Sequence, residues 1–261
     1  MTSVFDIANP HIVISGTIGS GKSTLARELG KAMQLPVYYE PVETNPYLNS
    51  FYTDQAKYAF PMQIFLLNAR YMQQQQIAWQ SLGAVQDRSV FEDSVFADML
   101  HEEGVLNDVD YATYSGLLQT MLRPLPRPTM IVYLDVTPQQ AMANIRARGR
   151  ECENSITIEY LTALRVAYEK FLVRISRTVP VVRVDNSKFP SVVSIVSEIQ
   201  RCYQSACNIH TAAIDNVPLT PPLRDSRAPD PEQLNKSGRS ETSCVVGSCP
   251  TDSWMTRVVE K

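Results

Sequence analysis

The chain has 261 residues, with 24 Lys plus Arg against 27 Asp plus Glu for a net charge of −3, and 44% of its residues are hydrophobic. This composition excludes a chain that is disordered throughout, because about 200 residues of this kind can bury a sizeable core. A nearly balanced charge without a basic block argues against nucleic-acid binding driven by bulk charge. Any anion-binding site must therefore be local.

The amino terminus and the cysteines bear on the compartment. The first 15 residues contain neither Lys nor Arg, which disfavours a secretory or organelle-targeting leader. No stretch approaches about 18 consecutive apolar residues, so we expect no membrane-spanning helix and no membrane partner. Five cysteines, an odd number scattered along the chain, indicate thiols that stay reduced. We therefore expect a cytoplasmic protein without disulfides.

Apolar residues alternate between strand and helix spacing along most of the chain. Short β-branched or apolar runs are typical of buried strands, and we expect strands at residues 11–15, 37–41, 83–87, 130–136 and 179–184. Helical spacing predicts helices at residues 25–33, 59–79, 90–103, 111–122, 156–175 and 190–203, and Thr137-Pro138 begins another. This alternation is typical of an α/β fold, a parallel sheet with helices on both faces.

The composition changes after about Asn208. Six of the seventeen prolines lie beyond this point, together with many Ser, Thr and Asp residues and little periodicity. Such a segment cannot bury enough apolar surface to fold. We expect a folded domain at residues 1–208 and a disordered Pro/Ser-rich tail at 209–261.

The segment after the first strand matches the glycine-rich phosphate loop GxxxxGK[ST]. Its residues are Gly16, Thr17, Ile18, Gly19, Ser20, Gly21, Lys22 and Ser23. In this motif, backbone N–H groups surround phosphate oxygens, Lys22 reaches the outer phosphates and the Ser23 hydroxyl can bind Mg²⁺. A Gly-rich turn that fits the pattern by chance is disfavoured, because the segment also lies between a predicted strand and a predicted helix.

Acidic and basic residues follow the second and third strands. Glu40 comes at the end of the second strand, and Asp87 and Arg88 at the end of the third. The carboxyl ends of parallel strands form the edge at which ligands bind. Glu40 could accept a proton from an attacking hydroxyl or be an exposed loop acid. Asp87 could hold Mg²⁺, with Arg88 beside the substrate, or the two could form a strand-end salt bridge.

Arginines gather between residues 144 and 153. Arg146, Arg148 and Arg150 surround Gly149 in the segment NIRARGRECE. Beside a phosphate site, such a cluster can close as a lid and stabilise charge that develops during phosphoryl transfer. A solvated basic turn is the alternative, and we favour the lid.

Four motifs in order resemble the deoxynucleoside kinase family. They are GTIGSGKST, YEPVE, DRSVFED and RARGRECE, and the resemblance covers about residues 11–204. It implies a P-loop kinase fold with a five-stranded parallel sheet and an Arg-rich lid. It also implies transfer of the γ-phosphoryl group of ATP to the 5′-hydroxyl of a deoxynucleoside, with Mg²⁺ as cofactor.

The resemblance assigns roles to individual residues. It implies four catalytic residues: Glu40, as the base, and Arg88, Arg148 and Arg150. Mg²⁺ would be bound by Ser23 and Asp87, and ATP by residues 16–23 with Thr24, Arg146 and Phe189. The substrate would be bound by Tyr52, Gln63, Arg70, Asp93 and Glu153. Tyr52 and Glu153 would face the sugar 3′-hydroxyl, and Phe189 would pack on adenine or anchor the following helix. The chain departs from the family at Asn144, an earlier lid position that is often Arg.

The nucleobase would be read from the long helix at residues 59–79. The Gln63 amide offers one donor and one acceptor to a base edge, and its usual aromatic neighbour is replaced by Met62. Arg70 and Asp93 match a pair found in relatives that take purines or deoxycytidine. We therefore expect purine deoxynucleosides to be favoured, with deoxycytidine next and thymidine disfavoured. A buried structural salt bridge is the alternative for this pair.

Two other functions share the phosphate loop. A nucleoside monophosphate kinase transfers the phosphoryl group to a phosphate acceptor, which a carboxylate such as Glu40 would repel. A P-loop switch or scaffold would need a γ-phosphate sensor such as DxxG at a strand end, which we do not find, and would leave the arginine cluster without a task. Relatives dimerise through helices like those at 59–79 and 111–122, so the resemblance also implies a homodimer.

Overall fold

The computed structural model describes residues 9–42, 44–80, 82–186, 191, 193–199 and 201–202. The predicted tail at 209–261 and Phe189 lie outside the described residues. None of the helices in the described ranges is long and apolar enough to cross a membrane.

Five parallel strands form one sheet. In the order in which they lie side by side, they are β2 (Val37–Tyr38), β3 (Ala84–Asp87), β1 (His11–Gly16), β4 (Met130–Asp135) and β5 (Val181–Asp185). This confirms the predicted α/β fold. The second strand is shorter than predicted, since only Val37 and Tyr38 pair with β3, and the chain from Tyr39 to Pro41 forms a loop at the sheet edge.

Seven α-helices and two short 3-10 turns are found between residues 9 and 186 of the described ranges. They are α1 (Lys22–Met33), α2 (Leu48–Thr53), α3 (Gln55–Gln80), η1 (Val90–Glu92), α4 (Ser94–Glu102), α5 (Asp108–Leu122), α6 (Pro138–Arg148), η2 (Glu151–Glu153) and α7 (Ile158–Ile175). Residues 193–199 are also helical, within the predicted closing helix. The predicted helix at 90–103 is interrupted, because its first residues form η1, and α2 was not predicted.

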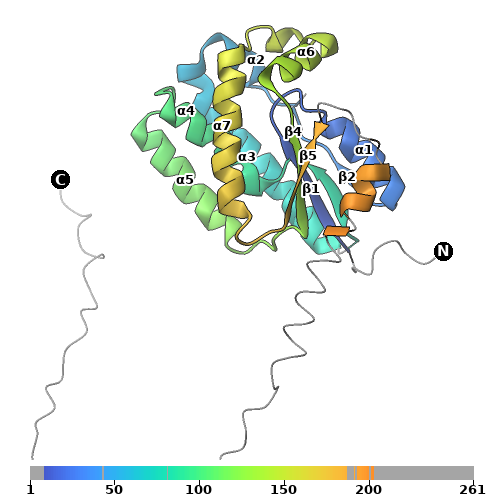
Figure 1. Ribbon diagram of the computed structural model, residues 1–261. Helices are drawn as coiled ribbons and strands as arrows, with labels where there is room; N and C mark the ends of the chain where they lie inside the picture. The colour runs from blue at the N-terminus through green and yellow to red at the C-terminus, as the bar shows by residue number, and fades with distance from the viewer. Residues whose placement is uncertain are drawn as a thin grey trace, which may run out of the picture. The chain divides into compact units, whose positions relative to one another are not determined.

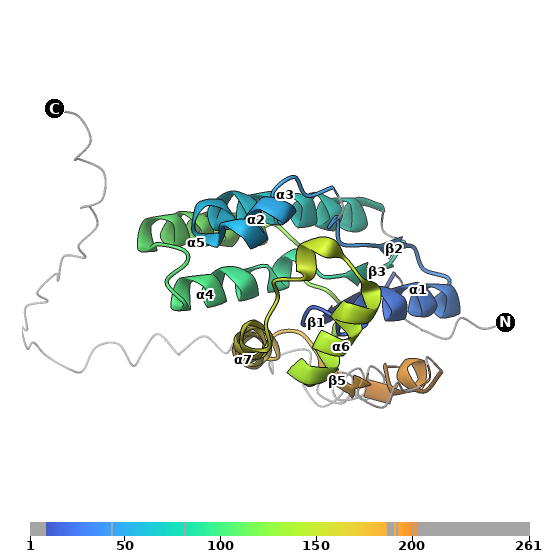
Figure 2. The same ribbon diagram turned by 90° about the horizontal axis from the view of Figure 1, so that it is seen from above.

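The helices cover both faces of the sheet (Figures 1 and 2). Figure 2 shows α3, α4, α5 and α7 on one side of the strands and α1 on the other. Strand residues alternate accordingly: Val13 and Ile131 pack toward the four-helix side, whereas Ile12 and Val132 pack toward α1. Both sets are at most 1% exposed, which explains why the strands are apolar runs without polar alternation.

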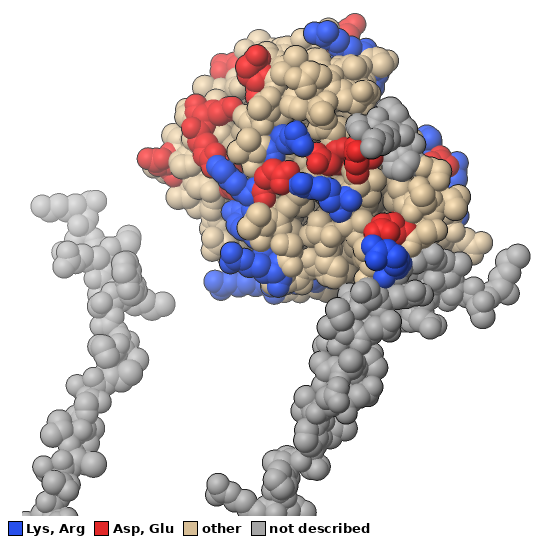
Figure 3. Space-filling model, in the orientation of Figure 1, with Lys and Arg blue, Asp and Glu red and all other residues tan. Residues whose placement is uncertain are grey.

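Charged residues pair with each other on the face that carries α7. Figure 3 shows positive and negative side chains beside one another there. Ion pairs join Arg174 to Asp98 at 2.9 Å and Lys170 to Glu102 at 2.7 Å. Lys170 and Arg174 are more than half exposed, so each pair contributes little to stability.

A buried histidine lies at the start of β1. His11 is 8% exposed, and its Nε2 lies 3.0 Å from Oε1 of Gln86 on β3. Burial lowers the pKa of this imidazole to about 4, although the Gln86 hydrogen bond acts in the opposite direction. The folded protein therefore excludes a proton that the unfolded chain accepts near pH 6.5.

We expect His11 to make the fold acid-sensitive. The stability that comes from keeping His11 neutral is fully present above pH 6.5 and is lost as the pH falls from 6.5 toward about 4. At pH 5 the free energy of unfolding should be lower by about 2 kcal/mol. In urea unfolding at pH 7 and pH 5, His11→Gln should remove most of this loss. His101→Gln, at a half-buried histidine on α4, is the matched control, and equal pH dependence in the wild type and His11→Gln would contradict the assignment.

Candidate active site

The phosphate loop follows β1 and begins α1. Gly16, Gly19 and Gly21 have positive φ angles of 148°, 76° and 90°, which glycine adopts at little cost. A Cβ atom at Gly16 would lie 2.9 Å from the Leu134 carbonyl oxygen. The glycines of the motif are therefore required both by conformation and by close packing.

Lys22 lies at the first position of α1 and is buried. Its Nζ donates a hydrogen bond to the Thr17 carbonyl at 2.7 Å. Burial, with Arg88 nearby, lowers the pKa of this amine to about 8. The hydrogen bond to Thr17 keeps the Lys22 Nζ beside the loop. A phosphate oxygen could replace the Thr17 carbonyl as the acceptor of this hydrogen bond.

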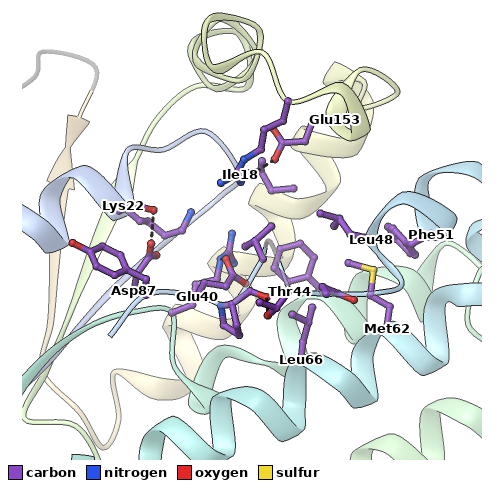
Figure 4. A pocket seen from close by; sticks show the side chains of 18 of the residues that line it. Ile18, Lys22, Glu40, Thr44, Leu48, Phe51, Met62, Leu66, Asp87 and Glu153 are labelled. Atoms are coloured by element: carbon purple, nitrogen blue, oxygen red, sulfur yellow. Dashed lines mark hydrogen bonds and ion pairs between the residues drawn. The ribbon is translucent and has the colours of Figure 1, made fainter. Parts of the chain in front are cut away.

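A cavity of about 520 Å³ opens beside the loop. In Figure 4, Lys22 and Asp87 lie at one end and Leu48, Phe51 and Met62 at the other. Glu40 lies between the two ends (Figure 4). The cavity thus joins a charged end at the sheet edge to an apolar end between α2 and α3.

Two arginines hold Glu40. Arg70 Nη2 donates a hydrogen bond to Glu40 Oε1, and Arg88 Nε lies 3.0 Å from Glu40 Oε2. The Glu40 side chain is 15% exposed. Burial alone would raise the pKa of this carboxyl, but Arg88, Arg70 and Lys22 outweigh it and lower the pKa to about 2. Glu40 is therefore an ionised acceptor at the cavity wall and not an exposed loop acid.

Arg88 is fixed by an unusual backbone and by aromatic neighbours. Its φ of 64° places a non-glycine residue in the left-handed region, which costs roughly 1–2 kcal/mol. Its Nη1 donates to the Tyr168 hydroxyl, and its guanidinium carbon lies 4.8 Å from the centre of the Phe96 ring. These contacts hold the guanidinium toward Glu40 at the end of β3.

Ser23 and Asp87 lie together at the charged end. Ser23 Oγ donates to Asp87 Oδ2 at 2.5 Å, and Asp87 Oδ1 is buried without a partner. Burial raises the pKa of Asp87, although Lys22 opposes this. Asp87 makes no ion pair with Arg88 in the described residues, so the strand-end salt bridge is not formed. A hydroxyl and a carboxylate oxygen in need of a partner suit a hard cation such as Mg²⁺.

Arg70 and Asp93 form a buried ion pair. Arg70 Nη1 donates to Asp93 Oδ1, and the Tyr114 hydroxyl donates to Asp93 Oδ2 at 2.5 Å. Arg70 lines the cavity, whereas Asp93 is fully buried behind it and does not. Arg70 thereby connects Asp93 to Glu40, a link that the sequence did not reveal.

The arginine-rich segment comprises the end of α6, Gly149, Arg150 and η2. Arg148 Nη2 donates to both oxygens of Glu153 at 2.7 and 2.6 Å, and Arg150 Nη1 lies 3.6 Å from Glu153 Oε1. All three line the cavity, whereas Arg146 is exposed and does not. Two of the three arginines of the segment are thus held at the cavity wall by the Glu153 carboxylate.

The remaining predicted residues are divided between the cavity and its surroundings. Ile18, Gly19, Tyr52 and Gln63 line it, and Gln63 Oε1 is buried without a partner. Thr24 is exposed on α1 and does not line it. The other four residues of the loop, Gly16, Thr17, Ser20 and Gly21, do not line it either.

Several lining residues were missed from the sequence. They are Tyr39, Pro41, Val42, Thr44, Asn45, Leu48, Phe51, Met62, Leu66, Phe96 and Tyr160. Most are apolar. Those on helices have the spacing of core residues, whereas Tyr39, Pro41 and Val42 lie in the loop after β2. The buried Glu92, which accepts a hydrogen bond from Ser15 below the loop, was also missed, and burial raises the pKa of its carboxyl to about 7.

The sheet, the phosphate loop at its edge and the adjacent cavity define a P-loop kinase fold. The family model for deoxynucleoside kinases matches residues 12–207. The chain therefore belongs to the deoxynucleoside kinase family, and it is a kinase.

Named relatives agree with this membership. A deoxyadenosine kinase of Dictyostelium discoideum is 49% identical over 75% of this chain and 80% of its own length. A deoxyguanosine kinase of the same organism is 36% identical over 72% of this chain and 68% of its own length. The structure of deoxyadenosine kinase from M. mycoides with bound dATP has a TM-score of 0.66 and 32% identity, covering 74% of this chain and 98% of that one.

Proposed function

We propose that this kinase transfers the γ-phosphoryl group of ATP to the 5′-hydroxyl of a purine deoxynucleoside, with deoxycytidine as the next substrate. The observation that carries the proposal is the ionised Glu40 at the wall of the cavity whose charged end holds Lys22 of the phosphate loop. A sugar hydroxyl between the two would meet its proton acceptor on one side and the phosphoryl group on the other.

The charged end suits the phosphates. Lys22 and the backbone N–H groups of the loop would bind the outer phosphates. Ser23 and Asp87 would hold Mg²⁺, which supplies positive charge to the phosphate oxygens when bound. Arg88 would stabilise charge at the reacting oxygen beside Glu40, since its guanidinium faces the same carboxylate.

The apolar end suits a nucleobase. Gln63 is 1% exposed, and an unpartnered buried amide oxygen is costly without a ligand to satisfy it. Met62, Leu66 and Phe96 supply apolar and aromatic wall around it. Arg70 would meet the base edge while Asp93 holds it from behind. The names of the relatives support the purine preference, because they include two kinases for deoxyadenosine and deoxyguanosine, and another is a deoxyadenosine/deoxycytidine kinase of Bacillus subtilis.

The sugar would lie between the two ends. Tyr52 and Glu153 both line the cavity and would bind the 3′-hydroxyl. Glu153 also holds Arg148, so a sugar that engages Glu153 would position the segment that carries the arginines. We assign the lid role to Arg148 and Arg150 on this basis.

Rates with the four natural deoxynucleosides, each with ATP, test the substrate assignment. Deoxyadenosine and deoxyguanosine should give the highest kcat/KM, followed by deoxycytidine, with thymidine last. The reason is that Arg70, held in place by Asp93, would crowd the thymine methyl group. Thymidine as the best substrate would overturn the roles given to Arg70 and Asp93, and ADP release that ignores every nucleoside would overturn the kinase reaction itself.

We also propose a homodimer in the cytoplasm. An apolar groove lies along α3 and α5, lined by Phe60, Ile64, Phe65, Leu117 and Met121 among others. Leu117 is 42% exposed, and a second copy of the chain packed there would remove these side chains from water. The groove lies on the helices through which the resemblance implies dimerisation.

Leu117→Asp should shift the protein to monomers, because it places a charge in the apolar groove of the proposed interface. Analytical ultracentrifugation gives the mass. Val173→Asp is the matched control, since Val173 is exposed on α7 outside the groove. A wild-type monomer, or an unchanged dimer in Leu117→Asp, would contradict this surface.

A further inference from the structure

Two asparagine side chains contact the outer surface of the phosphate loop. Asn144 on α6 donates a hydrogen bond from Nδ2 to the Gly19 carbonyl oxygen at 2.7 Å. Asn186, directly after β5, donates from Nδ2 to the Ser20 carbonyl oxygen at 2.8 Å. Consecutive carbonyls of the loop are therefore held from two separate elements of the fold.

The packing leaves little space between the loop and these two elements. A Cβ atom at Gly19 would lie 2.5 Å from the Ala141 carbonyl oxygen on α6, and one at Gly21 would lie 3.0 Å from Asn186 Nδ2. Gln140 Nε2 also donates to Asn144 Oδ1 at 3.0 Å. Because Oδ1 already accepts this bond, the NH₂ group of Asn144 is directed at the loop.

The orientation of these carbonyls determines where the amide hydrogens point. In a trans peptide, the C=O and the following N–H lie on opposite sides of the chain. Holding the Ser20 carbonyl outward therefore turns the Gly21 N–H toward the other side, where it would meet a phosphate. Holding the Gly19 carbonyl fixes the following Ser20 N–H, which donates to the Thr17 carbonyl at 3.3 Å and closes the turn of the loop. Donors that are already oriented need no reorganisation when the ligand arrives.

We propose that Asn144 and Asn186 are positioning residues that hold the phosphate loop in its triphosphate-binding conformation. The inference rests on the proposed function only in that a triphosphate binds this loop. Asn144 stands at a position where an arginine is frequent in the family. Its side chain connects α6, which carries Arg146 and Arg148, to the phosphate loop.

Binding of inorganic tripolyphosphate and of ATP, measured by calorimetry, tests the proposal. Asn144→Ala and Asn186→Ala remove one donor each and should weaken both ligands by about tenfold, the usual effect of one hydrogen bond. Asn144→Asp and Asn186→Asp keep the side-chain volume but set a carboxylate against a carbonyl oxygen, so they should weaken binding at least as much. In kinetics, the KM for ATP should rise with a smaller change in kcat, and the deoxynucleoside KM should stay within about twofold.

The controls separate positioning from charge and from folding. Asn154→Asp adds the same charge at an exposed site directly after η2, outside the arginine-rich segment, and should leave tripolyphosphate binding unchanged. Wild-type tripolyphosphate affinity in both alanine variants would overturn the proposal, as would weaker binding only in the aspartate variants. Weaker ATP binding with unchanged tripolyphosphate binding in Asn186→Ala would place the effect at the adenine and would also overturn it.

The measurement distinguishes this inference from the proposed function. Tripolyphosphate carries no base or sugar and binds without a nucleoside. If the wild type phosphorylates none of the deoxynucleosides, the proposed reaction fails, whereas the affinities of the asparagine variants still decide whether the loop is held as we infer.

Discussion

Replacing Glu40 by Gln should lower kcat by about 10²-fold or more while ATP affinity stays largely unchanged. The carboxylate is ionised at neutral pH, because Arg88, Arg70 and Lys22 hold its pKa at about 2 against the effect of burial. Gln has the same shape and can still accept a hydrogen bond, but it cannot take the proton from a sugar hydroxyl. The loss should therefore appear in the chemical step and not in the binding of the phosphate donor.

Rapid-quench measurement of a single turnover, together with a calorimetric Kd for ATP, checks this expectation. Glu102→Gln makes the same change at an exposed carboxylate on α4 and should leave both quantities unchanged. A low pKa makes Glu40 a weak base, which fits phosphoryl transfer because its loose transition state depends mainly on positioning and charge. Near-normal turnover in Glu40→Gln would remove Glu40 from the role of base.

The charged end of the cavity could be predicted from the sequence because each of its residues follows a strand. A strand, a glycine-rich loop and a helix in succession identified Lys22 and Ser23, and strand ends identified Glu40, Asp87 and Arg88. In a parallel sheet these ends meet at one edge. The structure then places these particular ends side by side, because β1 lies next to β3 and β3 lies next to β2.

The apolar end could not be predicted in the same way. Phe51, Met62 and Leu66 line the cavity and are at most 8% exposed, so their sequence pattern is that of core residues. Phe96 was placed in a helical pattern for the same reason. Only a polar residue at such a position, as Gln63 is, gives a signal, because an amide is rarely buried without a partner.

Local backbone geometry also escaped the sequence. Periodicity predicted one helix at residues 90–103, yet the chain turns through Arg88 in the left-handed region and forms η1 before α4 begins. Side-chain pairs, and not apolar spacing, determine this turn: Ser89 Oγ accepts from the Phe91 N–H, and Ser15 donates to Glu92. The first contact is local, but the second joins residues 77 positions apart in sequence, which apolar spacing does not reveal.

Replacing Arg70 by Met should lower the free energy of unfolding by about 3–5 kcal/mol, the usual cost of removing one partner from a buried ion pair. Arg70 is 1% exposed and is the common partner of Glu40 and Asp93. Asp93 is fully buried, so it cannot exchange the lost guanidinium for water. Urea unfolding at pH 7 measures the loss, and Arg174→Met, which cuts an exposed ion pair with Asp98, should stay within about 0.5 kcal/mol of the wild type.

A second substitution tests the cause of this loss. If the uncompensated carboxylates produce it, Asp93→Asn should restore part of the stability in the Arg70→Met background, although alone it weakens the pair. Strictly additive losses in the double variant would show that the two side chains do not act on each other. Because Arg70 also contacts Glu40, the double variant should regain stability without regaining turnover, which separates the packing role of this arginine from its effect on the catalytic carboxylate.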